Sequence, residues 1–232
     1  MGSFDSLWHS FILNPTKIGD ISMEIQKNPT VVPQKAVKAE KILVVKRNKI
    51  LQEDAFSGFL PITNFENYLE IISNHKEFLW RADMELDTNY KQIIPYLIFN
   101  FQDKFFLMQR KSTASESRLK NKYSLGIGGH IRQEDMQSND IFDWAKREFA
   151  EEVNYKGNIS IKPIGVINDD GSDVGQVHMG FVFLLTGDSD NIKVKSELKD
   201  GTLLTLKECE HFYSSMESWT QLVVSYLNTL KF

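Results

Sequence analysis

The sequence predicts an α+β fold in which helices pack on a mixed β-sheet. Apolar runs typical of strands and segments with helical periodicity follow one another irregularly from about residue 40 onward. A regular alternation of strands and helices would instead predict a wholly parallel sheet. The chain has 232 residues and no internal repeat, so it is long enough for one large domain or for a domain plus an extension.

Residues 1–39 are expected to form an N-terminal extension with at most one short helix. They show no sustained hydrophobic periodicity, and Pro15, Pro29 and Pro33 interrupt them. The folded domain is therefore expected at residues 40–232. The extension is a candidate for mediating a homodimer.

Composition excludes several classes of protein. The net charge of −4 and the lack of a basic stripe disfavour nucleic acid as a partner. No apolar run reaches the ~18 residues that a membrane span needs, and the first residues lack the basic start of a secretory signal. The single cysteine, Cys209, excludes an intramolecular disulfide. We therefore expect a cytoplasmic protein with no membrane partner.

The first half of the domain contains strands around one helix. The stretch KILVVKRNKILQ (41–52) is rich in β-formers and broken by two polar residues, which predicts a hairpin. Apolar residues recur at helical spacing in 62–75, which predicts a helix. The very apolar stretch 92–111 predicts two strands that meet at a turn at Gln102–Asp103.

The second half begins with a polar loop at 111–122 and a short glycine-rich strand or turn at 123–131. The clearest helix of the chain covers 139–153, with polar N-cap residues before it. The remaining elements predicted from their patterns are two strands, at 159–169 and 177–187, and two helices, at 206–213 and 215–230.

The helix expected at 139–153 carries three glutamates beside its buried face. The apolar residues that share one arc are Ile141, Phe142, Ala145, Phe149 and Val153. Glu148, Glu151 and Glu152 fall on an adjoining arc within ~100° of one another, and only Arg147 relieves their repulsion. Mg²⁺ or Mn²⁺ would relieve it better, because both ions prefer carboxylate oxygens. The alternative is a surface helix with ordinary glutamates.

The stretch around this helix resembles the signature of the Nudix hydrolases. That signature runs glycine, five residues, glutamate, seven residues, then Arg-Glu-apolar-x-Glu-Glu-x-Gly-apolar. Gly129 matches the glycine, and REFAEEVNY (147–155) matches the second half. Asn154 replaces the last glycine, and asparagine also accepts the left-handed end of a helix. The stretches NKYSLGIGGHI and VHMGFVFLL resemble a bacterial-type branch of predicted phosphoesterases.

The first half of the signature departs from the family pattern. Asp135 stands where the family has glutamate, and Glu134 lies next to it. Eleven residues instead of seven separate Asp135 from Arg147. We interpret the four extra residues as a longer loop before the helix. Either Glu134 or Asp135 is expected to fill the upstream acidic position.

The resemblance implies a Nudix-like α/β/α sandwich with a mixed β-sheet and a metal-dependent pyrophosphohydrolase. Its substrate would be a small molecule that contains a nucleoside diphosphate joined to another group. Glu148, Glu151, Glu152 and the Gly129 carbonyl would bind Mg²⁺ or Mn²⁺ as cofactor, and Arg147 would orient the glutamates.

Two functional questions stay open at the level of sequence. Glu197, in a loop after a long apolar strand, is a candidate general base, and an exposed loop glutamate without a role is the alternative. The altered upstream acid motivates a second hypothesis, a catalytically weakened nucleotide-binding or regulatory module. A diphosphate isomerase of the same fold would need a cysteine near the glycine turn, and Cys209 lies far from it.

Candidate substrate-binding residues lie on both sides of the glycine turn. Arg110, Lys111 and Arg118 precede it and could bind a distal phosphate, since guanidinium donors match phosphate oxygens. His130 and His178 could contact phosphate as well. The alternatives are a solvated run of charges and two structural histidines.

Two further groups of charged residues are interpreted as structural and not catalytic. Arg81 and Glu85 are interpreted as a surface ion pair that contributes little stability. Asp169, Asp170 and Asp173 lack the distal glutamate of a calcium loop and are interpreted as a turn.

Overall fold

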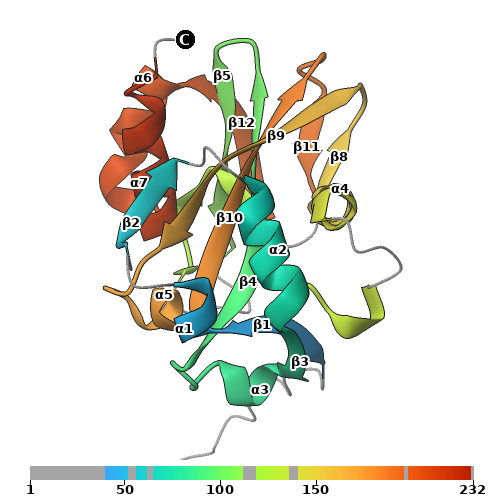
Figure 1. Ribbon diagram of the computed structural model, residues 1–232. Helices are drawn as coiled ribbons and strands as arrows, with labels where there is room; N and C mark the ends of the chain where they lie inside the picture. The colour runs from blue at the N-terminus through green and yellow to red at the C-terminus, as the bar shows by residue number, and fades with distance from the viewer. Residues whose placement is uncertain are drawn as a thin grey trace, which may run out of the picture. The chain divides into compact units, whose positions relative to one another are not determined.

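A mixed β-sheet forms the centre of the fold (Figure 1), and its main path runs β12-β5-β4-β10-β9-β2. The central strands β4 and β10 pair in parallel, whereas the other pairs on this path are antiparallel. The bounds are β2 Gly58–Pro61, β4 Tyr90–Phe101, β5 Lys104–Arg110, β9 Ile159–Asn168, β10 His178–Gly187 and β12 Leu198–Thr205. This computed structural model describes residues 40–51, 56–61, 65–111, 119–135, 141–195 and 198–230.

Shorter strands extend this sheet and add a second one. β1 pairs with both β3 and β4, β6 pairs with β5, and β7 pairs with β4. β8 and β11 form a separate two-stranded sheet. The bounds are β1 Lys41–Lys46, β3 Lys76–Trp80, β6 Tyr123–Ser124, β7 Gly126–Gly128, β8 Val153–Tyr155 and β11 Ile192–Val194.

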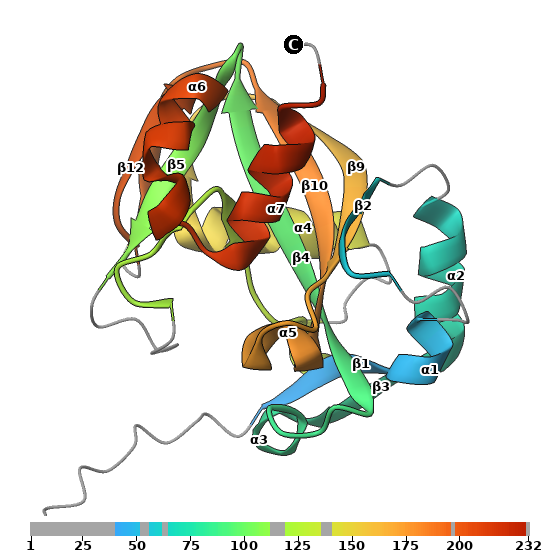
Figure 2. The ribbon, with the colours of Figure 1, turned by 90° about the vertical axis from the view of Figure 1, so that its left-hand side faces the viewer.

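Helices cover both faces of the sheet. α2 and α4 pack on one face and α6 and α7 on the other, so that Figure 2 shows α7 in front of the strands and α4 behind them. The bounds are α1 Arg47–Ile50, α2 Phe65–His75, α3 Arg81–Met84, α4 Ile141–Glu152, α5 Asp173–Val177, α6 Leu206–Cys209 and α7 Ser218–Leu227, with 3-10 turns at Gln133–Asp135 and Glu210–Ser215.

The strand β4 is a continuous apolar run because both of its faces are buried. Ile93, Leu97 and Phe99 belong to the core beneath α2 and α4. Tyr96 and Ile98 point to the opposite face and join the core beneath α6 and α7. Because side chains alternate along a strand, burial of both faces requires apolar residues at successive positions. The sandwich of two helical layers around a mixed sheet confirms the predicted α+β class.

Two local predictions are wrong. Residues 41–52 do not form a hairpin: β1 passes directly into α1, because β1 finds its partners in β3 and β4. Asn154 does not adopt a left-handed conformation; it lies in β8 and pairs with Lys193. The backbone N–H of Lys195 donates to the carbonyl of Glu152 at 2.8 Å, so the strand pairing itself caps the end of α4.

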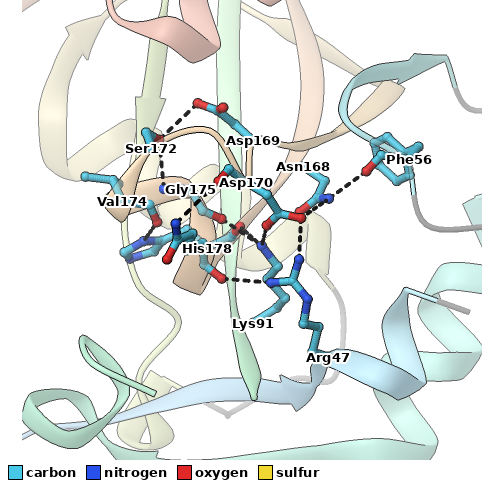
Figure 3. A network of polar contacts seen from close by, with 11 residues as sticks. Arg47, Phe56, Lys91, Asn168, Asp169, Asp170, Ser172, Val174, Gly175 and His178 are labelled. Atoms are coloured by element: carbon cyan, nitrogen blue, oxygen red, sulfur yellow. Dashed lines mark hydrogen bonds and ion pairs between the residues drawn. The ribbon is translucent and has the colours of Figure 1, made fainter. Parts of the chain in front are cut away.

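A buried lysine holds the segment that enters β10 (Figure 3). The side chain of Lys91 is fully buried, and its Nζ donates to Asp170 Oδ1 at 2.9 Å and to the carbonyl of Gly175 at 2.7 Å. Arg47 also pairs with Asp170. Burial lowers the pKa of Lys91, and Asp170 opposes that effect. The expected turn at Asp170 is thus part of a charged network that fixes α5.

Replacing Lys91 with methionine is expected to lower the free energy of unfolding by about 3 kcal/mol. The variant removes one of the cations that pair with Asp170. It also removes the hydrogen bond from Lys91 to the carbonyl of Gly175. Urea denaturation measures the change. Lys162→Met on the exposed edge of β9 is the matched control and should stay within about 0.5 kcal/mol of the unaltered protein. Equal stability of the two variants would contradict a structural role for Lys91.

No helix among the described residues combines the length and the apolar character needed to cross a membrane.

Candidate active site

A cleft of about 700 Å³ opens between α4, α5 and the start of α7. It brings together most of the residues singled out from the sequence. Of the candidate site residues, those that line it are Arg110, Gly129, His130, Arg147, Glu148, Glu151, Glu152 and His178, whereas Glu134 and Asp135 are not part of its described lining. Arg118 and Glu197 lie outside the described residues. Lys111 is half-buried and is absent from the described lining of the cleft.

Gly129 lies directly against the carboxylate of Glu148. A Cβ atom built on Gly129 would lie 2.0 Å from Glu148 Oε1, far inside van der Waals contact. The glycine follows β7, and Glu148 projects from α4 with only 9% of its surface exposed. The absence of a side chain at residue 129 therefore lets the buried carboxylate reach the backbone of the glycine turn.

Burial raises the pKa of Glu148 to about 7, from an ordinary value of 4.5. The charge of Arg147 opposes this shift, while Glu151 and Glu152 increase it. Burial therefore disfavours the charged form of this carboxylate, and a further cation beside it would favour that form.

The raised pKa predicts a pH-dependent stability of the metal-free protein. Between pH 4.5 and about 7 the folded state binds more protons at Glu148 than the unfolded state does. The contribution of Glu148 to the free energy of unfolding therefore falls as pH rises. Its full size is on the order of 3 kcal/mol. Glu148→Gln should therefore raise the melting temperature at pH 8, relative to the unaltered protein, by more than it does at pH 4. Thermal denaturation in a chelator measures both shifts, and equal shifts at the two pH values would contradict the burial of this charge.

Two arginines organise the acidic groups around Glu148. Arg147 lies 2.5 Å from Glu151 Oε1 and 3.1 Å from Asp135 Oδ2. Arg132 binds Asp135 through two contacts, with Nε at 2.9 Å from Oδ2 and Nη2 at 3.0 Å from Oδ1. This paired geometry is typical of strong guanidinium–carboxylate binding.

Of the two upstream acids, Asp135 is the one in this arginine network. Burial raises the pKa of Asp135, but the hydrogen bond from Arg132 and the charge of Arg147 outweigh burial and lower it overall. Asp135 is therefore anionic at neutral pH. The side chain of Glu134 is 63% exposed and lies 3.9 Å from Arg132. The geometry thus favours Asp135 for the upstream acidic position.

Arg110 reaches the cleft from the end of β5. Its Nε donates to Glu217 Oε1 at 2.6 Å, and Glu217 is itself nearly buried at the start of α7. This ion pair fixes the direction of the guanidinium group. Arg110 lines the cleft and has further N–H donors, which suit a phosphate oxygen as acceptor.

The two histidines form a contact of their own on another wall of the cleft. Their Nε2 atoms lie 3.3 Å apart, and His130 Nε2 is 2.7 Å from Gln92 Oε1. Arg81 and Glu85 form the expected ion pair at 3.2 Å. The pair lies in the lining of the cleft and not on the open surface that we expected.

Several cleft residues were missed by sequence reasoning. Arg132 lies three residues before Asp135 and forms an ion pair with it. A basic residue at this short spacing from the acid is a local signal that could have identified Arg132. Glu217 and Trp219 come from the closing helix, about 90 residues after the glycine turn, and no local pattern links them to it.

Comparisons with known proteins agree with this fold. No protein-family model matches the sequence. The crystal structure of Tm1382, described as "a putative Nudix hydrolase", is similar with a TM-score of 0.70 at 33% sequence identity, over 82% of this chain and 100% of Tm1382. The chain belongs to the Nudix superfamily.

A sequence relative covers a similar share of the chain. Protein YmaB of Bacillus subtilis (strain 168) is 31% identical over 207 residues, which amount to 81% of this chain and 97% of YmaB.

Proposed function

We propose that this protein hydrolyses a phosphoanhydride bond in a small molecule that contains a nucleoside diphosphate, with Mg²⁺ or Mn²⁺ as cofactor. The observation that carries the proposal is the meeting of Glu148, Glu151, Glu152 and Gly129 in one cleft. Similarity to a protein described as a Nudix hydrolase supports the same class of reaction.

The residues present fit a hard divalent ion. Glu148, Glu151, Glu152 and the Gly129 carbonyl offer only oxygen donors, which Mg²⁺ and Mn²⁺ prefer. Burial raises the pKa of the Glu148 carboxylate, and a bound cation would favour its charged form. When bound there, the ion would neutralise phosphate charge and lower the pKa of a coordinated water.

The protein's own side chains would orient the reactants. Arg147 holds Glu151 from one turn earlier on α4, and Arg132 keeps Asp135 beside them. Arg110, fixed by Glu217, would bind a phosphate oxygen at the distal end of the diphosphate. The attacking water must lose a proton to a carboxylate, and Glu197 remains the proposed acceptor.

An aromatic side chain in the cleft suits a nucleoside. Trp219 lines it beside Tyr96, with the two rings in an edge-to-face contact and their centroids 5.5 Å apart. An indole held in this way offers an apolar surface to a base, and base–aromatic stacking contributes about 1–3 kcal/mol. The cleft therefore combines acidic side chains for metal and diphosphate with an aromatic side chain for the base.

A substrate screen tests the proposal. The full chain is incubated with nucleoside-diphosphate-linked compounds and Mg²⁺ or Mn²⁺, and released monophosphate is measured. Metal-dependent release supports hydrolysis. Calorimetric titration with the same compounds identifies the alternative, a binding or regulatory module, by binding without release. Absence of both binding and release contradicts the proposed substrate class.

We also propose that residues 40–232 form the Nudix domain, that residues 1–39 form an extension mediating a homodimer, and that the protein works in the cytoplasm. The buried free thiol of Cys209 is compatible with a reducing compartment. Light scattering of the full chain tests the dimer, because a mass of a single chain would contradict it.

A further inference from the structure

Arg110 has a second cationic residue beside it in the cleft. The backbone N–H of Arg110 donates to the carbonyl of Lys122 at 3.0 Å. The pairing of β5 with β6 matches Gln109 with Tyr123, so Arg110 and Lys122 lie opposite each other at the next position. Side chains opposite each other in an antiparallel pair lie on the same face, with Cβ atoms about 4.5–5.5 Å apart. Both residues line the cleft.

The backbone around Lys122 is fixed by the turn that precedes it. The N–H of Lys122 donates to the carbonyl of Leu119 at 3.2 Å, which closes the turn. Asn121 within this turn adopts a left-handed conformation with a φ of 60°, which asparagine accepts more readily than most residues. Gln109 Nε2 donates to the carbonyl of Asn121 at 3.2 Å. Lys122 therefore leaves the turn at a defined place, and only its flexible side chain has to adjust to a ligand.

One carboxylate faces these two cations. Glu217 pairs with Arg110 at 2.6 Å, and its backbone N–H donates to the carbonyl of Tyr123 at 3.0 Å, so it is held to β6 as well. In the part of the chain that the structure describes, Lys122 has no ion pair of its own. Like charges directly opposite each other in a sheet repel. An anion bound between the two cations would relieve that repulsion.

The two cations lie near the acidic end of α4. Burial lowers the pKa of Arg110, but the charge and hydrogen bond of Glu217 outweigh burial, and the charge of Glu152 adds to the rise. Because Coulomb attraction weakens with distance, this effect indicates that Glu152 is close to Arg110. A diphosphate held by a metal ion at the glutamates of α4 would thus have one end near Arg110 and Lys122.

Two cations suit a terminal phosphate better than a neutral group. A terminal phosphate carries a charge of about −1.5 to −2 at pH 7, more than a phosphate esterified on both sides. Arg110 offers donors in a planar fork, and Lys122 offers an ammonium group that can turn toward the phosphate. A neutral sugar in the same place would leave the repulsion between the two cations in full.

We propose that Arg110 and Lys122 bind a terminal phosphate of the substrate, and that Lys122 is a specificity-determining residue. The inference rests on the proposed function and narrows its substrate class. The group joined to the nucleoside diphosphate would end in a phosphate, as in a nucleoside triphosphate, and not in a neutral sugar. Lys122 contributes to binding and takes no part in the chemical step, so its loss should raise KM and leave kcat nearly unchanged.

A comparison of matched substrates tests this role. The full chain is assayed with Mg²⁺ on the four ribonucleoside triphosphates and on the corresponding nucleoside-diphosphate glucoses, which share base, ribose and diphosphate. The unaltered protein is expected to have the higher kcat/KM on the triphosphate. Lys122→Met should lower that kcat/KM about 10- to 100-fold through KM, the loss expected for a hydrogen bond between charged groups. The same variant should leave kcat/KM on the glucose compounds unchanged.

Two variants control for position and for charge. Lys120→Met removes an exposed lysine of the same turn, outside the described lining of the cleft, and should change neither kcat/KM. Lys122→Arg keeps the charge and should retain the preference for the triphosphate. Thermal denaturation verifies that each variant is folded, and Lys122→Gln provides the test if Lys122→Met is not.

Three results would overturn the inference: a kcat/KM on the triphosphates no higher than on the glucose compounds, an equal loss on both classes in folded Lys122→Met, or the same loss in Lys120→Met. If no compound is hydrolysed, the proposed function fails, and calorimetric titration of the same proteins with the same compounds tests the inference alone. Binding that favours the triphosphate and depends on Lys122 then supports it. Binding without that dependence, or no binding, contradicts it.

Discussion

Replacing Glu152 with glutamine is expected to lower the rate of Mg²⁺-dependent hydrolysis on the order of 10²–10³-fold, the usual cost of removing one group that stabilises developing charge. Glu152 ends α4 and lines the cleft beside Glu148 and Glu151. The amide keeps the size of the side chain but loses its charge, so it binds a divalent ion less well. Steady-state kinetics on a substrate found by the screen measures the effect.

The same substitution should leave the metal-free protein as stable as before, or more stable. Glu152 raises the pKa of Glu148 by repulsion, and the variant removes that repulsion. Glu70→Gln on the exposed side of α2 is the matched control and should change neither rate nor stability. Full Mg²⁺-dependent activity in the Glu152 variant would contradict its assignment as a ligand.

Gly129→Ala is expected to lower the hydrolysis rate on the order of 10²-fold, because displacing a catalytic group by about 1 Å has effects of this size. The new Cβ would overlap Glu148 Oε1, which is the end of a flexible side chain, so the carboxylate can move away. The variant should therefore fold, and its defect should lie mainly in turnover. Steady-state kinetics measures the loss of turnover, and thermal denaturation verifies that the variant is folded.

A second glycine provides the control for this substitution. A Cβ on Gly171 would meet its nearest atom, Asp169 Oδ1, at an ordinary 3.4 Å, and Gly171→Ala should be nearly neutral. If Gly129→Ala retained the rate of Gly171→Ala, the contact between the glycine turn and Glu148 would have no role in hydrolysis.

The helix of the site could be predicted from sequence because its signals are local. The glutamates of α4 recur at helical spacing beside a buried stripe that includes Ala145 and Phe149, and the structure places the helix at Ile141–Glu152. The central strands β4 and β10 were equally clear, because burial on both faces demands uninterrupted apolar residues. The mixed character of the sheet followed from their irregular order with the helices.

Contacts between distant segments could not be predicted in the same way. The pairing of Arg110 with Glu217 joins residues 107 apart in sequence, and neither lies in a recognisable pattern. Glu85 was assigned correctly to a pair with Arg81, yet no local pattern in the sequence places it near His130. Asn154 shows a further limit, since strand pairing in β8 prevailed over its preference for a helix end.

The parallel pairing of β4 with β10 also has a kinetic consequence. It joins residues 86 apart, such as Asn100 and Thr186, and α4 lies within the loop that this pairing closes. Closing so long a loop is entropically costly and slows the folding of such topologies. On a ribosome, the acidic helix would emerge well before the strand that completes its surroundings. Stopped-flow refolding should accordingly show metal binding in the slow phase that forms the central sheet, and not in an earlier one.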